Sequence, residues 1–313
     1  MLGNSFMQIS DMKKFLIKVI TFFVFVTAID CIAGIVFSYL SDHAKGGMTR
    51  RDNYICNELN TDILLCGSSR CVHHYNPAII SDSLGLSCYN SGQDGNGVIL
   101  LYGRLQMIKS HHEPKLIIYD ITPGFDLLMG DDNHRYLTWL KPHYNREGIP
   151  EIFQSVDKTE RIKMLSNMYR YNSHFIELAV DYFYPIINAD DNGFVPIDKE
   201  MDKTKIRKGN DLVEKNYEFD PLKLDYIEEF AEEVGDRLVF VVSPIWYGMD
   251  SAQLKPLIEL CANRNIKLID FSNNPKYVHN DLFYKDGSHL NARGADEFTR
   301  DLIGELKNRG IMK

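Results

Sequence analysis

Short apolar runs separated by longer stretches with helical spacing dominate the chain after residue 60. Five runs of four to six residues are apolar enough for buried strands, at 63–66, 84–89, 116–119, 238–242 and 266–269. Between them, residues 98–110 and 251–264 repeat apolar positions at helical spacing. Apolar strands that alternate with helices are typical of a parallel sheet covered on both faces. The pattern predicts an α/β fold, a three-layer sandwich around a central parallel five-stranded sheet.

The stretch from about residue 126 to residue 219 breaks this rhythm. It shows no strand alternation and is rich in tyrosine, asparagine and charged residues. We expect a largely helical insertion between the third and fourth strands, in which residues 199–215 form an exposed loop or a ragged helix. The tyrosines suit the faces of sugars, although packing between helices is the simpler use for them.

Residues 15–40 form the longest apolar stretch, FLIKVITFFVFVTAIDCIAGIVFSYL. A membrane-spanning helix needs about 20 mostly apolar residues. No small-residue cleavage site of a signal peptide follows Leu40, so the stretch predicts a retained transmembrane anchor, with a long buried helix as the alternative. Asp30 interrupts it, and a carboxylate in lipid needs a partner, a proton or a shallow position.

Charges beside the apolar stretch do not decide its orientation. Lys13 and Lys14 precede it, while Lys45, Arg50 and Arg51 follow it. We expect three segments: a tail and anchor at 1–40, a linker or first helix at 41–60, and one α/β domain at 61–313 that contains the insertion. If the short N-terminal tail lies on the inner side of the membrane, everything beyond Leu40 is exported.

Composition narrows the classes of partner and cofactor. The 313 residues include 43 acidic and 35 basic ones, a formal net charge of −8. This acidic balance, without a basic stripe, predicts no nucleic-acid partner. The six cysteines form no C-x-x-C pair, so we expect neither a metal nor a cofactor. Cys66 and Cys88 lie in or beside apolar runs and are expected to be small buried hydrophobic residues.

Polar residues cluster where the predicted strands end, which is where open parallel sheets bind ligands. Residues 67–70 are Gly-Ser-Ser-Arg, residues 90–92 are Asn-Ser-Gly, and residues 120–122 are Asp-Ile-Thr. Near the C-terminus, residues 286–289 are Asp-Gly-Ser-His. Each segment alone is compatible with an ordinary turn or helix cap, so the argument depends on their order and placement.

These residue types match the needs of a serine esterase. Such an enzyme uses a hydroxyl nucleophile, an imidazole base, a carboxylate that orients the imidazole, and donors for the oxyanion. Ser69 is the candidate nucleophile, His289 the base and Asp286 its orienting carboxylate. We expect the three side chains to converge at one end of the sheet, with Ser69 rather than Ser68 as the nucleophile.

The arrangement resembles the SGNH/GDSL hydrolase superfamily, which has a flavodoxin-like fold and four conserved blocks. Residues 67–69 are similar to its Gly-Asp-Ser block, with Ser69 at the nucleophile position and Ser68 replacing the usual Asp. Gly92 stands where the family has its glycine oxyanion donor. Asp286 and His289 match the Asp-x-x-His block. The resemblance covers about residue 61 to the C-terminus, apart from the insertion.

The third block departs from the family. Residues 119–123 are Tyr-Asp-Ile-Thr-Pro and contain no Gly-x-Asn-Asp, so the side-chain oxyanion donor is missing. Thr122 or a residue of the insertion would have to replace it, or the backbone N–H groups of Ser69 and Gly92 would have to suffice. Asn90 and Arg70 are the candidates for binding substrate, with a plain surface cation as the alternative for Arg70.

The anchor, the Gly-Ser-Ser variant and the insertion are together similar to membrane-anchored bacterial SGNH-like proteins that work beside membrane-bound O-acyltransferases on surface polysaccharides. This resemblance implies a serine esterase or O-acyltransferase that acts on acyl esters of cell-envelope glycans, with its domain periplasmic or extracellular. Two alternatives stay open: a non-catalytic glycan-binding or scaffold protein of the same fold, and a soluble lipase whose apolar N-terminus docks on lipid.

Overall fold

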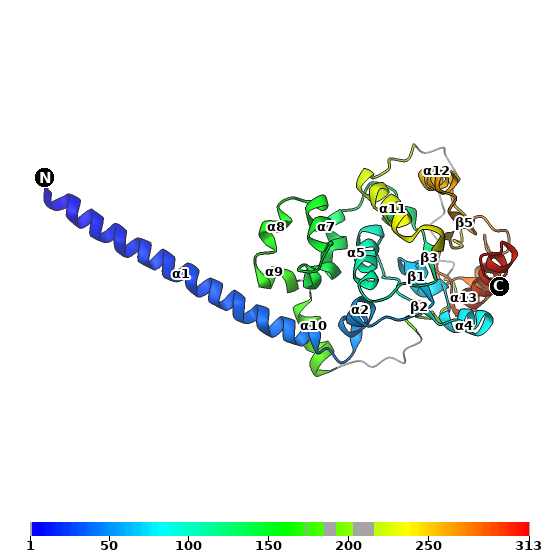
Figure 1. Cartoon of the computed structure of the whole chain (residues 1–313), viewed down its shortest axis with the longest axis horizontal. Coiled ribbons are helices and arrows are strands. Elements are labelled where there is room, and N and C mark those ends of the chain that lie inside the picture. Colours follow the sequence, from blue (N-terminus) through cyan, green and yellow to red (C-terminus); the bar gives the residue numbers. More distant parts are fainter. Residues whose placement is uncertain (1, 173, 185–191, 203–215, 313) are drawn as a thin grey trace. The chain divides into compact units, whose positions relative to one another are not determined.

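The computed structural model describes residues 2–172, 174–184, 192–202 and 216–312 (Figure 1). The chain divides into two compact units. The smaller unit comprises Met1–Arg50 and Thr159–Ile187, and the larger unit comprises Arg51–Lys158 and Asn188–Lys313. The insertion between the third and fourth strands therefore contributes to both units. Its expected loop or ragged helix at 199–215 lies mostly outside the described residues.

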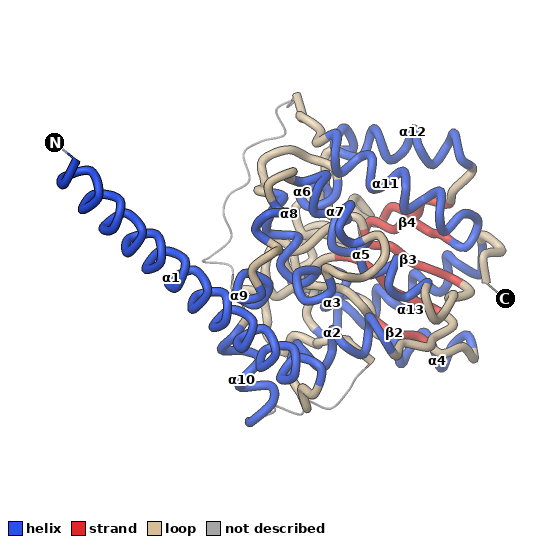
Figure 2. The backbone as a smooth tube through the Cα atoms, turned by 60° about the vertical axis from the view of Figure 1, so that its left-hand side comes forward, coloured by secondary structure: helices blue, strands red, loops and turns tan. Residues whose placement is uncertain are grey.

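The larger unit is built on a five-stranded, all-parallel sheet (Figure 2). Its strands are β1 (Ile63–Gly67), β2 (Cys88–Asn90), β3 (Leu116–Asp120), β4 (Leu238–Val242) and β5 (Lys267–Asp270). They lie side by side in the order β2-β1-β3-β4-β5. The predicted α/β class and the parallel five-stranded sheet are confirmed, because continuous apolar runs suit strands that are buried on both faces.

One predicted strand boundary is wrong. Residues 84–89 were expected to be extended throughout, but Leu84 is the last residue of helix α4 (Pro77–Leu84) and only Cys88 and Tyr89 of that run belong to β2. Gly85 ends the helix in the left-handed conformation at φ 66°. Leu84 and Leu86 pack against the hydrophobic core, so their apolar character reflects burial and not strand structure.

The helices of the larger unit occupy both faces of the sheet. On one face, Ile63, Ile118 and Val239 share a core with Phe298 of α13 (Ala292–Asn308). On the other face the ring of Tyr119 lies 5.1 Å from that of Phe230 in α11 (Pro221–Val234). Alternate strand residues thus pack into two different cores, because successive side chains of a strand point to opposite faces of the sheet.

The remaining helices connect the strands or build the insertion. Around the sheet they are α2 (Gly47–Asn57), α3 (Ser69–His74), α5 (Val98–Lys109), α6 (Pro123–Asp126), η3 (Gly235–Arg237), η4 (Ser251–Leu254), α12 (Lys255–Arg264) and η5 (Asp281–Phe283). The insertion adds η1 (Asn133–His143), α7 (Ile149–Val156), α8 (Glu160–Lys163), α9 (Asn167–Tyr171) and α10 (Phe175–Phe183). The regular elements of its described part are all helices, apart from the isolated bridge between Leu128 and Phe219, in agreement with its lack of strand alternation.

The smaller unit consists of the N-terminal helix and a helical segment of the insertion. Helix α1 (Leu2–Asp42) contains a stretch, Asp11–Asp42, that is long and apolar enough to cross a membrane. Helices α9 and α10 lie beside its C-terminal half in both views (Figures 1 and 2). The apolar N-terminal sequence therefore forms one long helix, and this helix has partners within its own unit.

Residues 41–60 contain helix α2, which places a buried ion pair in the larger unit. Asp52 is 5% exposed and accepts hydrogen bonds from Arg104 Nη2 at 2.7 Å and Nε at 3.2 Å. His143 Nε2 lies 3.0 Å from its second oxygen. Burial alone would raise the pKa of Asp52, but Arg104 and His143 lower it to about 2. Arg104 also donates to the carbonyl of Ser91 at 3.1 Å, so the pair ties α2 and α5 to the loop after β2.

We expect Arg104→Ala to destabilise the protein by about 3–5 kcal/mol, because removing one partner leaves a buried charge uncompensated. Arg300→Ala, at an exposed position of α13, is the matched control and should stay within about 0.5 kcal/mol. Urea unfolding of the full-length variants in one detergent measures both values. Equal stabilities of the two variants would refute the buried pair as a stabilising element.

Candidate active site

Ser69 is the first residue of α3 and lies directly beyond the carboxyl end of β1. The turn that carries it requires glycine at position 67, where φ is +150° and a Cβ would lie 2.7 Å from Cys71 Cβ and 2.8 Å from Asp120 O. As the first helical residue, Ser69 has a backbone N–H with no intrahelical acceptor. Its side chain is half-buried, whereas Ser68 is 1% exposed. The turn therefore presents Ser69 and encloses Ser68.

The structure brings Ser69, His289 and Asp286 into one chain of hydrogen bonds. Ser69 Oγ lies 2.9 Å from His289 Nε2. His289 Nδ1 lies 3.0 Å from Asp286 Oδ1 and 3.1 Å from Oδ2. Asp286 Oδ1 also accepts the backbone N–H groups of Ser288 and His289, each at 2.9 Å. This order of groups, hydroxyl to imidazole to carboxylate, is the geometry that activates a serine for nucleophilic attack.

Asp286 is held in its ionised form. Partial burial opposes ionisation, but the His289 ring and the backbone N–H groups of Ser288 and His289 hold the pKa of this carboxyl well below its usual range. An ionised Asp286 accepts a hydrogen bond from Nδ1–H of His289 and leaves Nε2 free to accept the proton of Ser69. The tautomer that general-base catalysis needs is therefore favoured.

A buried network holds the segment that carries His289. His74 Nε2 accepts the backbone N–H of Leu290 at 3.0 Å, so Nε2 is unprotonated and Nδ1 carries the proton. Nδ1 then donates to Ser243 Oγ at 3.1 Å, and Ser243 donates to Asp120 Oδ2 at 3.0 Å. Burial first, and the nearby charge of Arg70 second, hold the pKa of His74 well below its usual value. A neutral, fully buried histidine thus holds the segment that carries His289 in position.

His73, the neighbour of His74, faces the candidate site. Its ring lies edge-on to that of His289, with centroids 5.6 Å apart. Nδ1 lies 2.7 Å from the carbonyl of Val195, and Nε2 lies 3.6 Å from Asp94 Oδ1. Burial lowers the pKa of His73, but the hydrogen bonds to Asp94 and Val195 outweigh it and raise that pKa overall. The two adjacent histidines diverge, and the sequence analysis did not find the position of His73 beside the site.

We expect the His73–Asp94 pair to stabilise the fold in a pH-dependent way. The pKa of His73 is raised in the folded state, so its contribution is complete below the ordinary histidine value of about 6.5. It is lost as pH rises through the folded-state value. His73→Gln should lower Tm at pH 5.5 and much less at pH 8.5. The loss in free energy of unfolding at pH 5.5 should stay below about 1 kcal/mol, because Asp94 is largely exposed. A Tm difference that does not change with pH would contradict this.

The three expected oxyanion donors differ in their availability. Ser69 offers the N–H of a helix start. Gly92 donates its N–H to Asn90 Oδ1 at 3.0 Å, so the expectation of a free donor there is wrong in this structure. Thr122 donates its N–H to Asp126 Oδ2 at 2.7 Å, and its hydroxyl is bonded to Ser68 Oγ at 2.9 Å. Thr122 therefore contacts the neighbour of the candidate nucleophile.

Arg70 does not contact solvent as a surface cation would, and its expected role in substrate binding is wrong. The residue is 4% exposed. Its guanidinium donates to the carbonyls of Ile121 and Ser243 and lies 3.7 Å from Asp120 Oδ2. It also donates from Nε to Thr122 Oγ1 at 3.2 Å. Arg70 therefore cross-links the loops after β3 and β4 beneath the site.

Asn90 is also structural, which corrects its expected role as a substrate contact. It is fully buried. Its Nδ2 donates to the carbonyls of Cys71 at 2.7 Å and Tyr75 at 3.1 Å, while Oδ1 accepts the N–H of Gly92. These bonds satisfy the amide internally and join the loop after β2 to α3. No hydrogen-bonding capacity is left for a substrate.

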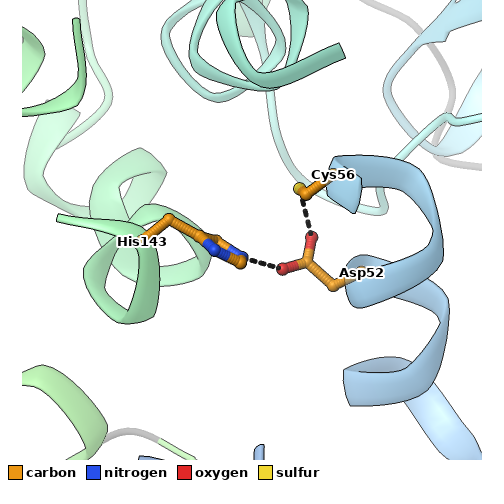
Figure 3. A group of neighbouring side chains, drawn as sticks. All are labelled: Asp52, Cys56 and His143. Carbon is orange, nitrogen blue, oxygen red and sulfur yellow. Dashed lines mark hydrogen bonds and ion pairs between the residues drawn. The ribbon is translucent and has the colours of Figure 1, made fainter. Parts of the chain in front are cut away.

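Asp52, Cys56 and His143 place ligand-type atoms within 4.8 Å of one another (Figure 3). Asp52 is already neutralised by Arg104 and bonded to His143. Burial, together with the charge of Asp52, raises the pKa of the Cys56 thiol well above its usual value. A metal would need a thiolate at this position. The cluster is therefore a buried hydrogen-bond network, and we assign it no metal.

Comparisons with known proteins add little to this geometry. No family model matches the chain, and no curated protein matches it. Among solved structures it is similar to a Streptococcus pneumonia protein described as a candidate platelet activating factor, with 10% identity, a TM-score of 0.40 and coverage of 88% of this chain and 98% of the other. It is also similar to a gut microbial diltiazem-metabolizing enzyme, with 10% identity, a TM-score of 0.38 and coverage of 78% and 47%. Both similarities are too low to transfer a reaction to this chain.

Proposed function

We propose that the protein is a serine-dependent ester hydrolase or O-acyltransferase that uses Ser69, His289 and Asp286. The observation that carries this proposal is the hydrogen-bonded series from Ser69 Oγ through the His289 ring to Asp286. Ser69 meets Asp286 and His289, which come more than 200 residues later in the sequence, at the carboxyl end of a parallel sheet, where this architecture binds ligands. A half-buried serine at a helix start, beside an imidazole held by an ionised carboxylate, supports nucleophilic chemistry over a structural role.

The reaction would proceed in two halves. Ser69 Oγ attacks the ester carbonyl carbon while His289 Nε2 takes the hydroxyl proton. The N–H of Ser69, at the start of α3, faces the developing oxyanion. Collapse of the tetrahedral intermediate breaks the bond to the alcohol, which leaves with the proton from His289, and an acyl-serine remains. Water or a second hydroxyl then attacks this acyl-serine with His289 again as the base, which gives hydrolysis or acyl transfer.

The substrate class we propose is acyl esters of cell-envelope glycans. This choice follows from the resemblance to anchored SGNH-like proteins, and the apolar helix α1 supports it because it would hold the domain at a membrane. By the same resemblance, the domain would lie on the periplasmic or extracellular side and work beside a membrane-bound O-acyltransferase. Glycan esters would then reach Ser69 from the cell-envelope side of the membrane.

Turnover of a simple acyl ester tests the reaction class. The full chain, purified in a mild detergent, should hydrolyse 4-methylumbelliferyl acetate above the rate in buffer. It should also release acetate from an acetylated polysaccharide, or move acetyl groups to one. Absence of turnover on the simple ester and on the polysaccharide alike would reject an enzymatic function.

A non-catalytic glycan-binding or scaffold protein is the second candidate, and two observations favour it. The glycine N–H that the SGNH family uses for the oxyanion is bonded here to Asn90 Oδ1, and no asparagine stands in the third block. Losing one oxyanion donor costs about 10²–10³ in rate. A protein with this role would retain glycan binding, measured by calorimetry, and show no dependence on Ser69.

A further inference from the structure

The smaller unit carries an apolar surface that α1 leaves uncovered. Eight large hydrophobic side chains of its insertion segment are 39–78% exposed, and we call six of them the apolar surface of residues 162–183. They are Ile162, Leu165, Met168, Phe175, Ile176 and Phe183. Among the described residues of the larger unit, the exposed large hydrophobic side chains are five and are widely separated in sequence. Isolated cases need no explanation, whereas six exposed apolar side chains within 22 residues need one.

Asp30 of α1 fixes the position of this segment along the N-terminal helix. Its carboxylate accepts hydrogen bonds from Ser166 Oγ at 2.7 Å, Asn167 N at 2.8 Å, Asn167 Nδ2 at 3.0 Å and Met168 N at 2.9 Å. Two of these donors are N–H groups at the start of α9, which have no acceptor within the helix. The carboxylate that interrupted the apolar stretch therefore caps a helix of the insertion.

Further contacts keep α9 and α10 beside the last turns of α1. The rings of Phe37 and Tyr171 lie 5.7 Å apart, and those of Tyr39 and Tyr182 lie 5.9 Å apart. Asp181 Oδ2 accepts the N–H of Thr49 at 3.0 Å. These contacts place the segment alongside the C-terminal part of the apolar helix and leave the apolar side chains of the segment exposed.

The depth of Asp30 decides what covers those side chains. A span of about 20 residues that begins near Phe15 ends near Ile35, so Asp30 lies about 7 Å inside this end. A carboxylate at that depth needs protein partners, and α9 supplies them. The start of α9 must then lie at the same depth, near the boundary between acyl chains and headgroups. An apolar surface at this boundary faces lipid.

We propose that the apolar surface of residues 162–183 is inserted into the headgroup–acyl boundary of the bilayer that α1 spans. The chain then holds the membrane through one spanning helix and one shallow helical contact. This inference rests on the anchor in the proposed function and goes beyond it, because it assigns a membrane contact to a segment of the insertion. Short helices with exposed aromatic and aliphatic residues suit such an interfacial position.

The test uses full-length variants in nanodiscs made from phosphatidylcholine with or without brominated acyl chains. Each variant adds one tryptophan at an exposed position: Ile176→Trp in the proposed contact, Phe25→Trp in the apolar centre of α1, and Ile258→Trp on α12. Bromine quenches only nearby tryptophan, and the wild-type signal of Trp139 and Trp246 is subtracted. We expect strong quenching of the tryptophans at 176 and 25 and none at 258.

The outcomes separate the contact from the anchor. Quenching at position 25 with none at 176 would overturn the membrane contact and leave the anchor intact. No quenching at either position would overturn both. Cross-linking of two copies through this surface, without quenching at 176, would assign it to self-association and also overturn the proposal. Leu165→Trp, which should be quenched like Ile176→Trp, repeats the measurement should the first variant fold poorly.

Discussion

Ser69→Ala should abolish ester hydrolysis, with a loss of about 10⁴-fold or more in kcat. The reason is the 2.9 Å hydrogen bond that makes Ser69 Oγ the group whose proton His289 takes. Without this hydroxyl no acyl-serine forms, and only direct attack by water remains. Initial rates on 4-methylumbelliferyl acetate at saturating substrate measure the effect.

Ser68→Ala is the matched control, because it removes the adjacent hydroxyl. Ser68 is buried and bonded to Thr122 Oγ1 at 2.9 Å, so its loss should cost stability of about 1 kcal/mol and leave most of the activity. Activity that survives Ser69→Ala and disappears in Ser68→Ala would reverse the assignment of the nucleophile.

Asp286→Asn should lower kcat by about 10⁴-fold with little change in stability. The amide oxygen can keep the two bonds from the backbone N–H groups of Ser288 and His289. The amide nitrogen then faces His289 Nδ1 and donates to it. Nδ1 becomes an acceptor, Nε2 carries the proton, and the imidazole can no longer accept the proton of Ser69.

The pH dependence distinguishes this effect from a general loss of charge. The pKa of Asp286 lies well below its usual range, so Asp286 should stay ionised at any pH above about 4. Wild-type activity should therefore show no loss from protonation of Asp286 in that range. Asp82→Asn, at an exposed position of α4, is the control and should keep wild-type kcat. An Asp286→Asn enzyme with kcat within tenfold of the control would exclude the orienting role.

The sequence was sufficient to predict the sheet because its strands are buried on both faces. Continuous apolar runs such as 238–242 need no periodicity to be recognised, and that run is β4 without change. The placement of Ser69, His289 and Asp286 was predictable for a related reason, since each follows a strand or stands just before the last helix. Parallel topology brings such positions to one edge of the sheet.

Other features depend on contacts that no local pattern reveals. Arg70 stands next to the candidate nucleophile, but its guanidinium turns inward to carbonyls 51 and 173 residues away in sequence. Asn90 is at a strand end like the site residues, yet its side-chain amide is hydrogen-bonded to a backbone carbonyl of α3. Asp30 finds its partners 136 to 138 residues later. Burial and distant pairing decided these roles, and composition carries no signal for either.

Covalent labelling with a fluorophosphonate, followed by peptide mapping of the full-length protein, tests the central claim most directly. The probe reports only a serine that is activated as a nucleophile, and it needs no knowledge of the natural substrate. We expect a single adduct on Ser69, formed in the wild type and in Ser68→Ala and absent from Ser69→Ala and Asp286→Asn. An unlabelled Ser69 in a folded wild-type protein, or an adduct on another serine, would contradict the account.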